Sequence, residues 1–191
     1  MSLLPIYNCY HPILKKKTNQ VTEFNQDLKD FINNMFETMY KADGVGLAAN
    51  QVGQSLSVIV IDTSEAKDEK DCHPPIAMIN PEIITFSDEL IEYQEGCLSI
   101  PKFYEDVDRP KEIEVRYFDI DMKEITITAD LLFARVIQHE IDHLNGILFY
   151  ERLSSLRRTL AKSKLRKIEK GDYSTFYPMV MPNGTMREAT E

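Results

Sequence analysis

The segment over residues 129–145 constrains the fold of this chain most, because its apolar residues recur three and four positions apart. This spacing predicts an amphipathic helix, and Gly146 is a suitable residue to end it. The helix carries His139 and His143, which are four residues apart and therefore share one face. Two imidazoles at this spacing can bind one metal ion, and Glu140 beside the first can act as a general base toward water. The alternative is a charged helix face that matches the H-E-x-x-H pattern by chance.

A catalytic metal site usually has three protein ligands and one open position, so two histidines are too few. Phe149 stands where metzincin metalloproteases place their third histidine. His73 lies in a polar loop, where we expect a solvent-facing side chain, and His11 has no partner motif. Cys97 follows a glycine at the end of a strand candidate and would complete a Cys/His/His set. A buried thiol in a turn is the alternative interpretation of Cys97.

A loop of small residues, 44–53, contains Gly-x-Gly but no third glycine at dinucleotide spacing and no Gly-Lys-Ser/Thr. The loop is therefore neither a Rossmann fingerprint nor a P-loop. Its glycines would allow a substrate backbone to approach closely. Gln51 at its end offers a neutral amide donor, which is suited to polarising a carbonyl oxygen.

The remaining pattern predicts two more helices, over residues 24–40 and 154–170, and an exposed loop over residues 64–75. Strands in a run followed by helices indicate an α+β domain rather than alternating βαβ units. We expect one domain over residues 1–172 and an irregular tail over residues 173–191. The strand candidates are residues 57–62, 76–79, 83–86, 90–93, 113–118 and 125–128.

Length and composition exclude several classes of protein. A chain of 191 residues suffices for one domain with a sizeable core, and a second domain would be cramped. No apolar run approaches the roughly 18 to 20 residues that cross a membrane, and the first residues lack a signal-peptide pattern. Three cysteines without a secretory signal argue against a disulfide framework and favour a reducing cytosol.

Charge is unevenly distributed along the chain. The net charge of −9 makes nucleic-acid binding by the whole surface unfavourable. Residues 154–170 nevertheless hold seven Lys and Arg against one Glu, a local charge of +6, so the rest of the chain carries −15. This segment is either a solvated helix face or a docking surface.

Three stretches together resemble the three signature motifs of the peptide deformylase family, in the same order. The resemblance covers about residues 1–170, and the family removes the formyl group from the N-terminal methionine of newly made polypeptides. It implies antiparallel β-sheets packed around a central metal-binding helix, with an N-terminal and a C-terminal helix. The stretches are Gly44-Val45-Gly46-Leu47-Ala48-Ala49-Asn50-Gln51, Glu95-Gly96-Cys97-Leu98-Ser99 and Gln138-His139-Glu140-Ile141-Asp142-His143-Leu144.

The resemblance also implies roles for individual residues. Cys97, His139 and His143 would hold one divalent metal ion, natively Fe²⁺, with Zn²⁺, Ni²⁺ or Co²⁺ as alternatives in purified protein. Glu140 would transfer a proton between water and the leaving amine. The Gln51 amide and the backbone N–H of Leu98 would stabilise the oxyanion. The peptide channel would be lined by Val45, Gly46, Glu95 and Gly96. The methionine pocket would be formed by Tyr93, Leu132 and Val136, with Val45.

By the same resemblance, the partners are formyl-methionyl nascent peptides in the cytoplasm, and the basic segment 154–170 contacts the ribosome. Neither membrane association nor sequence-specific nucleic-acid binding is expected. Several positions depart from the common pattern of the family. Asn50 replaces a usual proline, and Tyr10-His11-Pro12 replaces Gly-Asp-Pro. Arg135 stands where an apolar residue is frequent. An arginine that often follows the cysteine motif is missing, and Tyr104 or Arg109 could take its place.

Two functions of other classes remain open from the residues alone. A metallopeptidase of another type would need a third histidine or a downstream Glu ligand, and Glu151 is too close to the motif helix. A non-catalytic structural-zinc module would need a fourth ligand, which Cys72 or Cys9 would have to supply.

Overall fold

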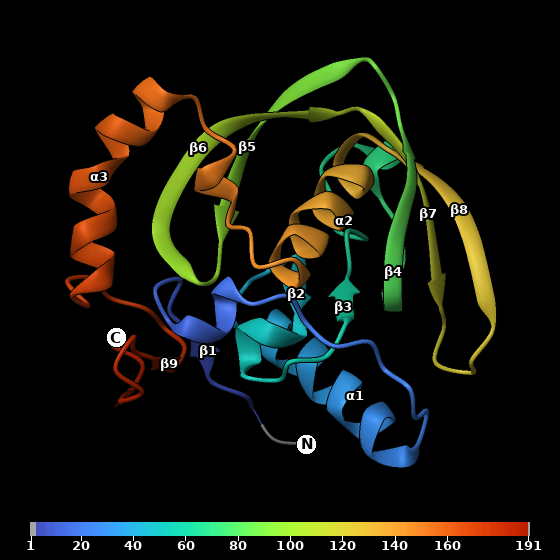
Figure 1. Ribbon diagram of the computed structural model, residues 1–191, viewed down its shortest axis with the longest axis horizontal. Helices are drawn as coiled ribbons and strands as arrows, with labels where there is room; N and C mark the ends of the chain where they lie inside the picture. The colour runs from blue at the N-terminus through green and yellow to red at the C-terminus, as the bar shows by residue number, and fades with distance from the viewer. Residues whose placement is uncertain (1–2, 191) are drawn as a thin grey trace.

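The computed structural model describes residues 3–190, and the expected domain and tail therefore include a few residues, 1–2 and 191, that lie outside the described part. At its centre is α2 (Leu131–Leu144), which carries both motif histidines and has twelve buried residues. Figure 1 shows α2 between the large sheet on one side and the β5–β6 hairpin on the other. The predicted α+β fold, with sheets around a central helix and a helix toward each end, is confirmed.

The large sheet has five strands in the order β2-β3-β4-β7-β8, and every neighbouring pair is antiparallel. β4 is one continuous strand where the sequence predicts two. The Asn80-Pro81 step that suggests a break is absorbed by a register shift against β7 between Ile79 and Glu82. A proline within a sheet is tolerated at such a bulge. The strands are β2 (Gly46–Ala48), β3 (Val58–Ile61), β4 (Ile76–Phe86), β7 (Glu112–Phe118) and β8 (Glu124–Asp130).

A separate hairpin of β5 (Leu90–Cys97) and β6 (Ile100–Pro110) curves past α2 and carries Cys97 at its end (Figure 1). The sequence does not predict β6. Its inward positions include Phe103, Val107 and the buried Arg109, so a charged residue interrupts the apolar alternation that marks a strand.

Two further helices flank this core. Asn25 caps the start of α1 (Gln26–Lys41) by accepting a hydrogen bond from the backbone N–H of Leu28, and α1 packs on β2 and β3. α3 (Ser155–Glu169) packs on β6 through a buried stripe of Ala161, Leu165 and Ile168. Leu156 and Leu160 of the same helix lie away from that stripe and are exposed.

The segment after α3, where we expect irregular chain, contains two short strands. β9 (Met179–Val180) pairs in parallel with β1 (Ile6–Tyr7) and antiparallel with β10 (Met186–Arg187). A segment near the start of the described chain therefore lies beside one near its end, as β1 and β9 show in Figure 1. Strands of two residues have no periodicity to detect, and their pairing joins segments far apart in sequence. Among the described residues, no helix has both the length and the apolar character needed to cross a membrane.

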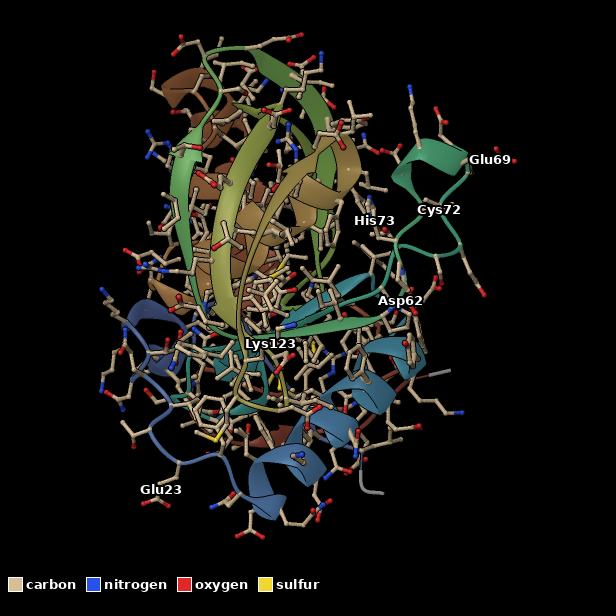
Figure 2. The ribbon with its side chains drawn as sticks, turned by 90° about the vertical axis from the view of Figure 1, so that its right-hand side faces the viewer. Glu23, Asp62, Glu69, Cys72, His73 and Lys123 are labelled. Carbon is tan, nitrogen blue, oxygen red and sulfur yellow. The ribbon has the colours of Figure 1, made fainter. Side chains whose placement is uncertain are left out.

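The loop between β3 and β4 projects from the body of the molecule, as the sequence predicts, but its base is attached to α2 (Figure 2). The Asp71 carboxylate accepts a hydrogen bond at 3.1 Å from the backbone N–H of Leu132, in the first turn of α2. Asp130, the residue before α2, makes no side-chain cap. His73, which we expect to face solvent, instead stacks on Phe133 with ring centroids 4.1 Å apart. The loop thus supplies the N-terminal cap that α2 lacks.

Candidate metal centre and its pocket

Three side chains that the sequence singles out as metal ligands meet beside α2. Ligand atoms of Cys97, His139 and His143 all lie within 4.8 Å of one another, and no other such cluster occurs among residues 3–190. The Cys97 Sγ atom is 3.2 Å from His143 Nε2. The two histidines project from successive turns of α2, with ring centroids 5.0 Å apart. Cys97 arrives from the end of β5, where the pairing with β6 shifts register.

This set of donor atoms fits a divalent metal ion. One thiol and two imidazoles are ligands that zinc and ferrous iron accept, and three protein ligands leave an open position. Buried polar atoms normally have partners, yet Glu140 Oε2 and His143 Nδ1 have none in the described structure. Cys9 and Cys72 lie outside the cluster within the described residues, so neither supplies the fourth ligand of a closed structural site.

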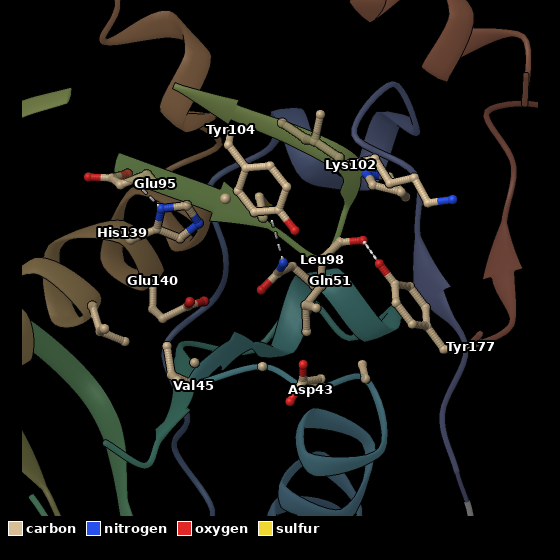
Figure 3. Close-up of a pocket in the computed structure, with 18 of the residues that line it drawn as sticks. Asp43, Val45, Gln51, Glu95, Leu98, Lys102, Tyr104, His139, Glu140 and Tyr177 are labelled. Carbon is tan, nitrogen blue, oxygen red and sulfur yellow. Dashed lines mark hydrogen bonds and ion pairs between the residues drawn. The ribbon is translucent and has the colours of Figure 1, made fainter. Parts of the chain in front are cut away.

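Glu140 is buried beside the cluster, and burial raises the pKa of its carboxyl group to about 7. Its carboxylate occupies the space in front of Gly46 on β2. A Cβ atom at position 46 would lie 2.5 Å from Glu140 Oε1 and 2.7 Å from Val136 Cγ1. The close approach that we expect from this glycine is therefore made by the side chains of α2 (Figure 3).

Glu95 orients one of the histidines. Its carboxylate is buried, and Oε2 lies 2.9 Å from His139 Nδ1, which leaves the other ring nitrogen for the metal cluster. Although burial opposes ionisation, hydrogen bonds from His139 and Arg109 hold the pKa of Glu95 well below its usual value. Glu95 does line the pocket, as predicted, but its charged end turns toward α2 (Figure 3).

Buried arginines extend this arrangement behind the cluster. Arg109 donates to Glu95 Oε1 at 2.7 Å and to Asp142 Oδ2 at 2.6 Å. Arg135 donates to the same Glu95 oxygen at 2.7 Å and to the Val107 carbonyl at 2.8 Å. The sequence indicates Arg109 only as a candidate to replace a missing arginine, and it gives no sign that Asp142 forms an ion pair. Ion pairs thus join α2 to both strands of the β5–β6 hairpin, which becomes visible only when these elements are placed in space.

Gln51 lies in the short 3₁₀ helix η2 (Ala49–Val52) and is oriented by two contacts. Its amide oxygen accepts a hydrogen bond at 2.8 Å from the backbone N–H of Ala48. Its NH₂ group therefore faces the other way, toward Ser99 Oγ at 3.2 Å and Cys97 Sγ at 3.6 Å. Asn50 beside it is fully buried and donates to the backbone carbonyl of His143, which ties the loop to α2.

A cavity of about 360 Å³ opens onto the metal cluster and lies within the range typical of small-ligand sites. Tyr93 is not among its lining residues, although the family resemblance implies a place for it in the methionine pocket. The Arg135 guanidinium, which does line the cavity, lies over the Tyr93 ring at 5.5 Å. The predicted site residues that line the cavity are Val45, Gly46, Gln51, Glu95, Gly96, Cys97, Leu98, Leu132, Val136, His139 and Glu140.

Part of the cavity lining comes from a segment for which the sequence predicts no role. Residues 174–177, between α3 and β9, border the cavity together with Lys102 and Tyr104 of β6. The Tyr177 hydroxyl donates a hydrogen bond at 2.8 Å to the backbone carbonyl of Leu98 (Figure 3). The segment has no motif or periodicity, and its position follows from the pairing of β9 with β1.

Comparisons with known proteins agree with this geometry. The family model described as "Polypeptide deformylase" matches residues 3–159. A peptide deformylase of Brucella suis is 42% identical over 88% of this chain and 94% of its own length, and one of Christiangramia forsetii is 43% identical over 95% and 97%. The crystal structure of a plant peptide deformylase superposes with a TM-score of 0.83 at 35% identity, covering 90% of this chain and 92% of its own. The chain therefore belongs to the peptide deformylase family of metal-dependent hydrolases.

Proposed function

We propose that this site removes the formyl group from the N-terminal methionine of newly synthesised polypeptides and releases formate. The observation that carries the proposal is the cluster of Cys97, His139 and His143 beside Glu140, whose Oε2 atom has no partner in the described structure. Cys97, His139 and Glu140 line one cavity. Membership of the deformylase family supports the same reaction.

A divalent metal ion held by Cys97, His139 and His143 would supply Lewis acidity toward the formyl group and water. We propose Fe²⁺ as the native ion, because a thiolate ligand supports a softer metal, with Zn²⁺, Ni²⁺ or Co²⁺ able to occupy the site in purified protein. Glu95 would keep the His139 ring in the orientation that ligation requires.

Glu140 would take a proton from the attacking water and deliver it to the nitrogen of the leaving amine. A general base works best when its pKa lies near the working pH, and burial raises the pKa of Glu140 to about 7. Glu140 lines the cavity, and its Oε2 atom has no hydrogen-bond partner in the described structure, so no other protein group there competes for its proton.

Gln51 and the backbone N–H of Leu98 would stabilise the negative charge that develops on the formyl oxygen. The tie between the Gln51 amide oxygen and Ala48 supports this role, because it directs the NH₂ group toward Cys97. The donor is therefore oriented before substrate arrives, which is the condition for effective electrostatic stabilisation.

The peptide would lie as an added strand along β2, which is the edge strand of the large sheet and borders the cavity at Gly46. Leu132 and Val136 of α2, with Val45, would surround the methionine side chain. Tyr93 is not part of this pocket, because it does not line the cavity.

Anaerobically purified protein should contain about one metal ion per chain and release formate from formyl-Met-Ala-Ser. Burial of the methionine side chain supplies roughly 1.5 to 3 kcal/mol, so formyl-Gly-Ala-Ser should have a kcat/KM value roughly ten- to hundredfold lower. Cleavage of internal peptide bonds without formate would indicate a metallopeptidase of another type. Tightly held metal without any turnover would indicate a structural site.

We also propose that α3 docks the protein on the ribosome in the cytoplasm, where formyl-methionyl chains emerge. Its cations are exposed, apart from the half-buried Arg157, and Leu156 and Leu160 stand exposed among them. Phosphate contacts release counterions, so the binding should weaken as salt rises.

The ribosome contact can be tested without truncation, which would also remove the chain after α3. Arg166, Lys167 and Lys170 are exposed, and replacing all three by Glu should abolish cosedimentation with ribosomes at low salt. A control that changes the exposed Lys16, Lys41 and Lys67 to Glu carries the same charge change away from α3 and should still sediment. Equal loss in both variants would contradict a contact specific to α3.

A further inference from the structure

The segment over residues 174–177 connects the reacting end of the cavity with the C-terminal sheet. Tyr177 is buried, and burial raises the pKa of its hydroxyl group well above the usual value, so the hydroxyl stays protonated. It donates to the Leu98 carbonyl at 2.8 Å. Leu98 directly follows the candidate ligand Cys97, so the segment is held against the part of the chain that faces the metal.

Hydrogen bonds hold this segment in place as a fixed wall. The backbone N–H of Thr190 donates to the Thr175 carbonyl at 2.7 Å, and the Thr175 backbone N–H donates to Thr190 Oγ1 at 3.2 Å. The Thr175 hydroxyl donates to the Tyr177 carbonyl at 2.8 Å. The chain then enters β9, which is paired on both sides. The strand β10 is therefore part of what positions the wall.

Two aromatic side chains on the cavity are exposed. Phe176 of the wall is 62% exposed, and Tyr104 of β6 is 60% exposed. Lys102, with a left-handed φ of 57°, donates to Ser174 Oγ at 2.5 Å and so joins β6 to the wall. Exposed rings at the mouth of a cavity gain free energy when a ligand covers them.

The part of the cavity beside residues 174–177 is available for the peptide residues that follow methionine, because the formyl group and the methionine side chain occupy other parts. The formyl end belongs at Cys97 and Glu140, and the methionine side chain belongs between Leu132 and Val136. A strand advances about 3.3 Å per residue, so the next two residues reach roughly 7 Å further. We infer that the wall 174–177, through the exposed ring of Phe176 and together with Tyr104 of β6 on the same cavity, makes the enzyme favour an apolar or aromatic side chain at the second or third residue of the formyl peptide. This inference rests on the proposed deformylase function.

The test compares kcat/KM for formyl-Met-Ala-Ala, formyl-Met-Phe-Ala and formyl-Met-Ala-Phe. Wild-type protein should favour one of the two Phe peptides over the Ala peptide by roughly three- to tenfold, as an aromatic contact would provide. Phe176→Ala should remove that preference and leave formyl-Met-Ala-Ala turnover within about twofold of wild type, since the side chain is exposed. The lost preference should appear in KM, because the wall contacts neither the formyl group nor Glu140.

Phe86→Ala is the matched control, because Phe86 on β4 is 57% exposed and lines a different cavity. It should keep the wild-type preference. The inference is overturned if wild type shows no preference, if Phe176→Ala retains it, or if Phe176→Ala loses as much turnover on the Ala peptide. Failure of the proposed function looks different, since metal-loaded wild type would then release no formate from any of the three peptides.

Discussion

The helices α2 and α3 have almost the same length and are both rich in polar side chains, yet their environments are opposite. α2 has fourteen residues, of which twelve are buried. α3 has fifteen residues, of which three are buried. Both helices are amphipathic in sequence, but only α2 is enclosed by strands on two sides (Figure 1).

This difference shows that burial, rather than the number of charges, marks the reactive helix. A buried polar group without a partner costs free energy, so a protein retains one only where it is compensated or used. On α2, Arg135 and Asp142 are fully partnered by ion pairs, whereas Glu140 and His143 each keep one atom without a partner in the described structure. The cations of α3 remain hydrated and therefore act through a surface instead of a pocket.

The largest difference in metal content and activity should come from removing one nitrogen-containing side chain from each helix. His143→Ala removes one of three candidate ligands, and two ligands hold a dissociable metal poorly, so bound metal and formate release should fall together to background. Lys164→Ala on the exposed face of α3 should change neither. Metal analysis alongside the formate assay measures both effects. Stoichiometric metal in His143→Ala would exclude His143 as a ligand.

The second prediction separates proton transfer from metal binding on α2. Glu140→Gln keeps the shape of the side chain but cannot accept the proton, so kcat should fall about 10²- to 10⁴-fold while metal content is unchanged. The measurement is kcat on metal-quantified protein. Parallel loss of metal would show that Glu140 acts as a ligand or supports one.

The third prediction concerns the charges that enclose α2. Arg109→Leu removes one of the buried partners of Glu95 and the buried partner of Asp142, and breaking such pairs should lower the free energy of unfolding by about 3–5 kcal/mol. Arg116→Leu breaks the exposed pair with Glu82, where both charges stay hydrated, and should leave stability nearly unchanged. Urea unfolding of metal-free protein compares the two. Equal effects would mean that burial does not distinguish these ion pairs.

The smallest effects should lie within α3 itself. Leu165 is 6% exposed and packs in the cluster with Phe103 and Phe149, so Leu165→Ala should cost about 2–5 kcal/mol of unfolding free energy. Leu160 is 72% exposed, and Leu160→Ala should cost less than about 0.5 kcal/mol. Thermal or urea unfolding distinguishes them. A reversed order would contradict the packing of α3 on β6.

Features that depend on neighbours in sequence could be predicted. Helical spacing predicts α1, α2 and α3 within one or two residues, and the H-E-x-x-H spacing indicates a metal site on α2. The third ligand is harder to predict, because Cys97 is distant in sequence and its turn, taken alone, favours a buried thiol. The resemblance to a family, rather than spacing, selects it, and the structure brings its Sγ atom to 3.2 Å from His143.

Features that depend on which strand lies beside which could not be predicted. β6 escapes detection because Arg109 occupies an inward position, and that arginine is stable there only because Glu95 and Asp142 meet it. The same pairing turns Glu95 away from the peptide channel and toward His139. Tyr93 is excluded from the cavity lining for a related reason, since Arg135 lies over its ring.

The sequence by itself therefore determined the helices, the α+β class and the candidate roles of His139, Glu140 and His143, since these follow from local spacing and side-chain chemistry, whereas Cys97 was selected through the family resemblance. Only the tertiary structure decided which carboxylate orients His139, what fills the space at Gly46, and that residues 174–177 close one side of the cavity. The physical reason is that burial and ion pairing arise between segments far apart in the chain, and the pairing of β9 with β1 has no local signal.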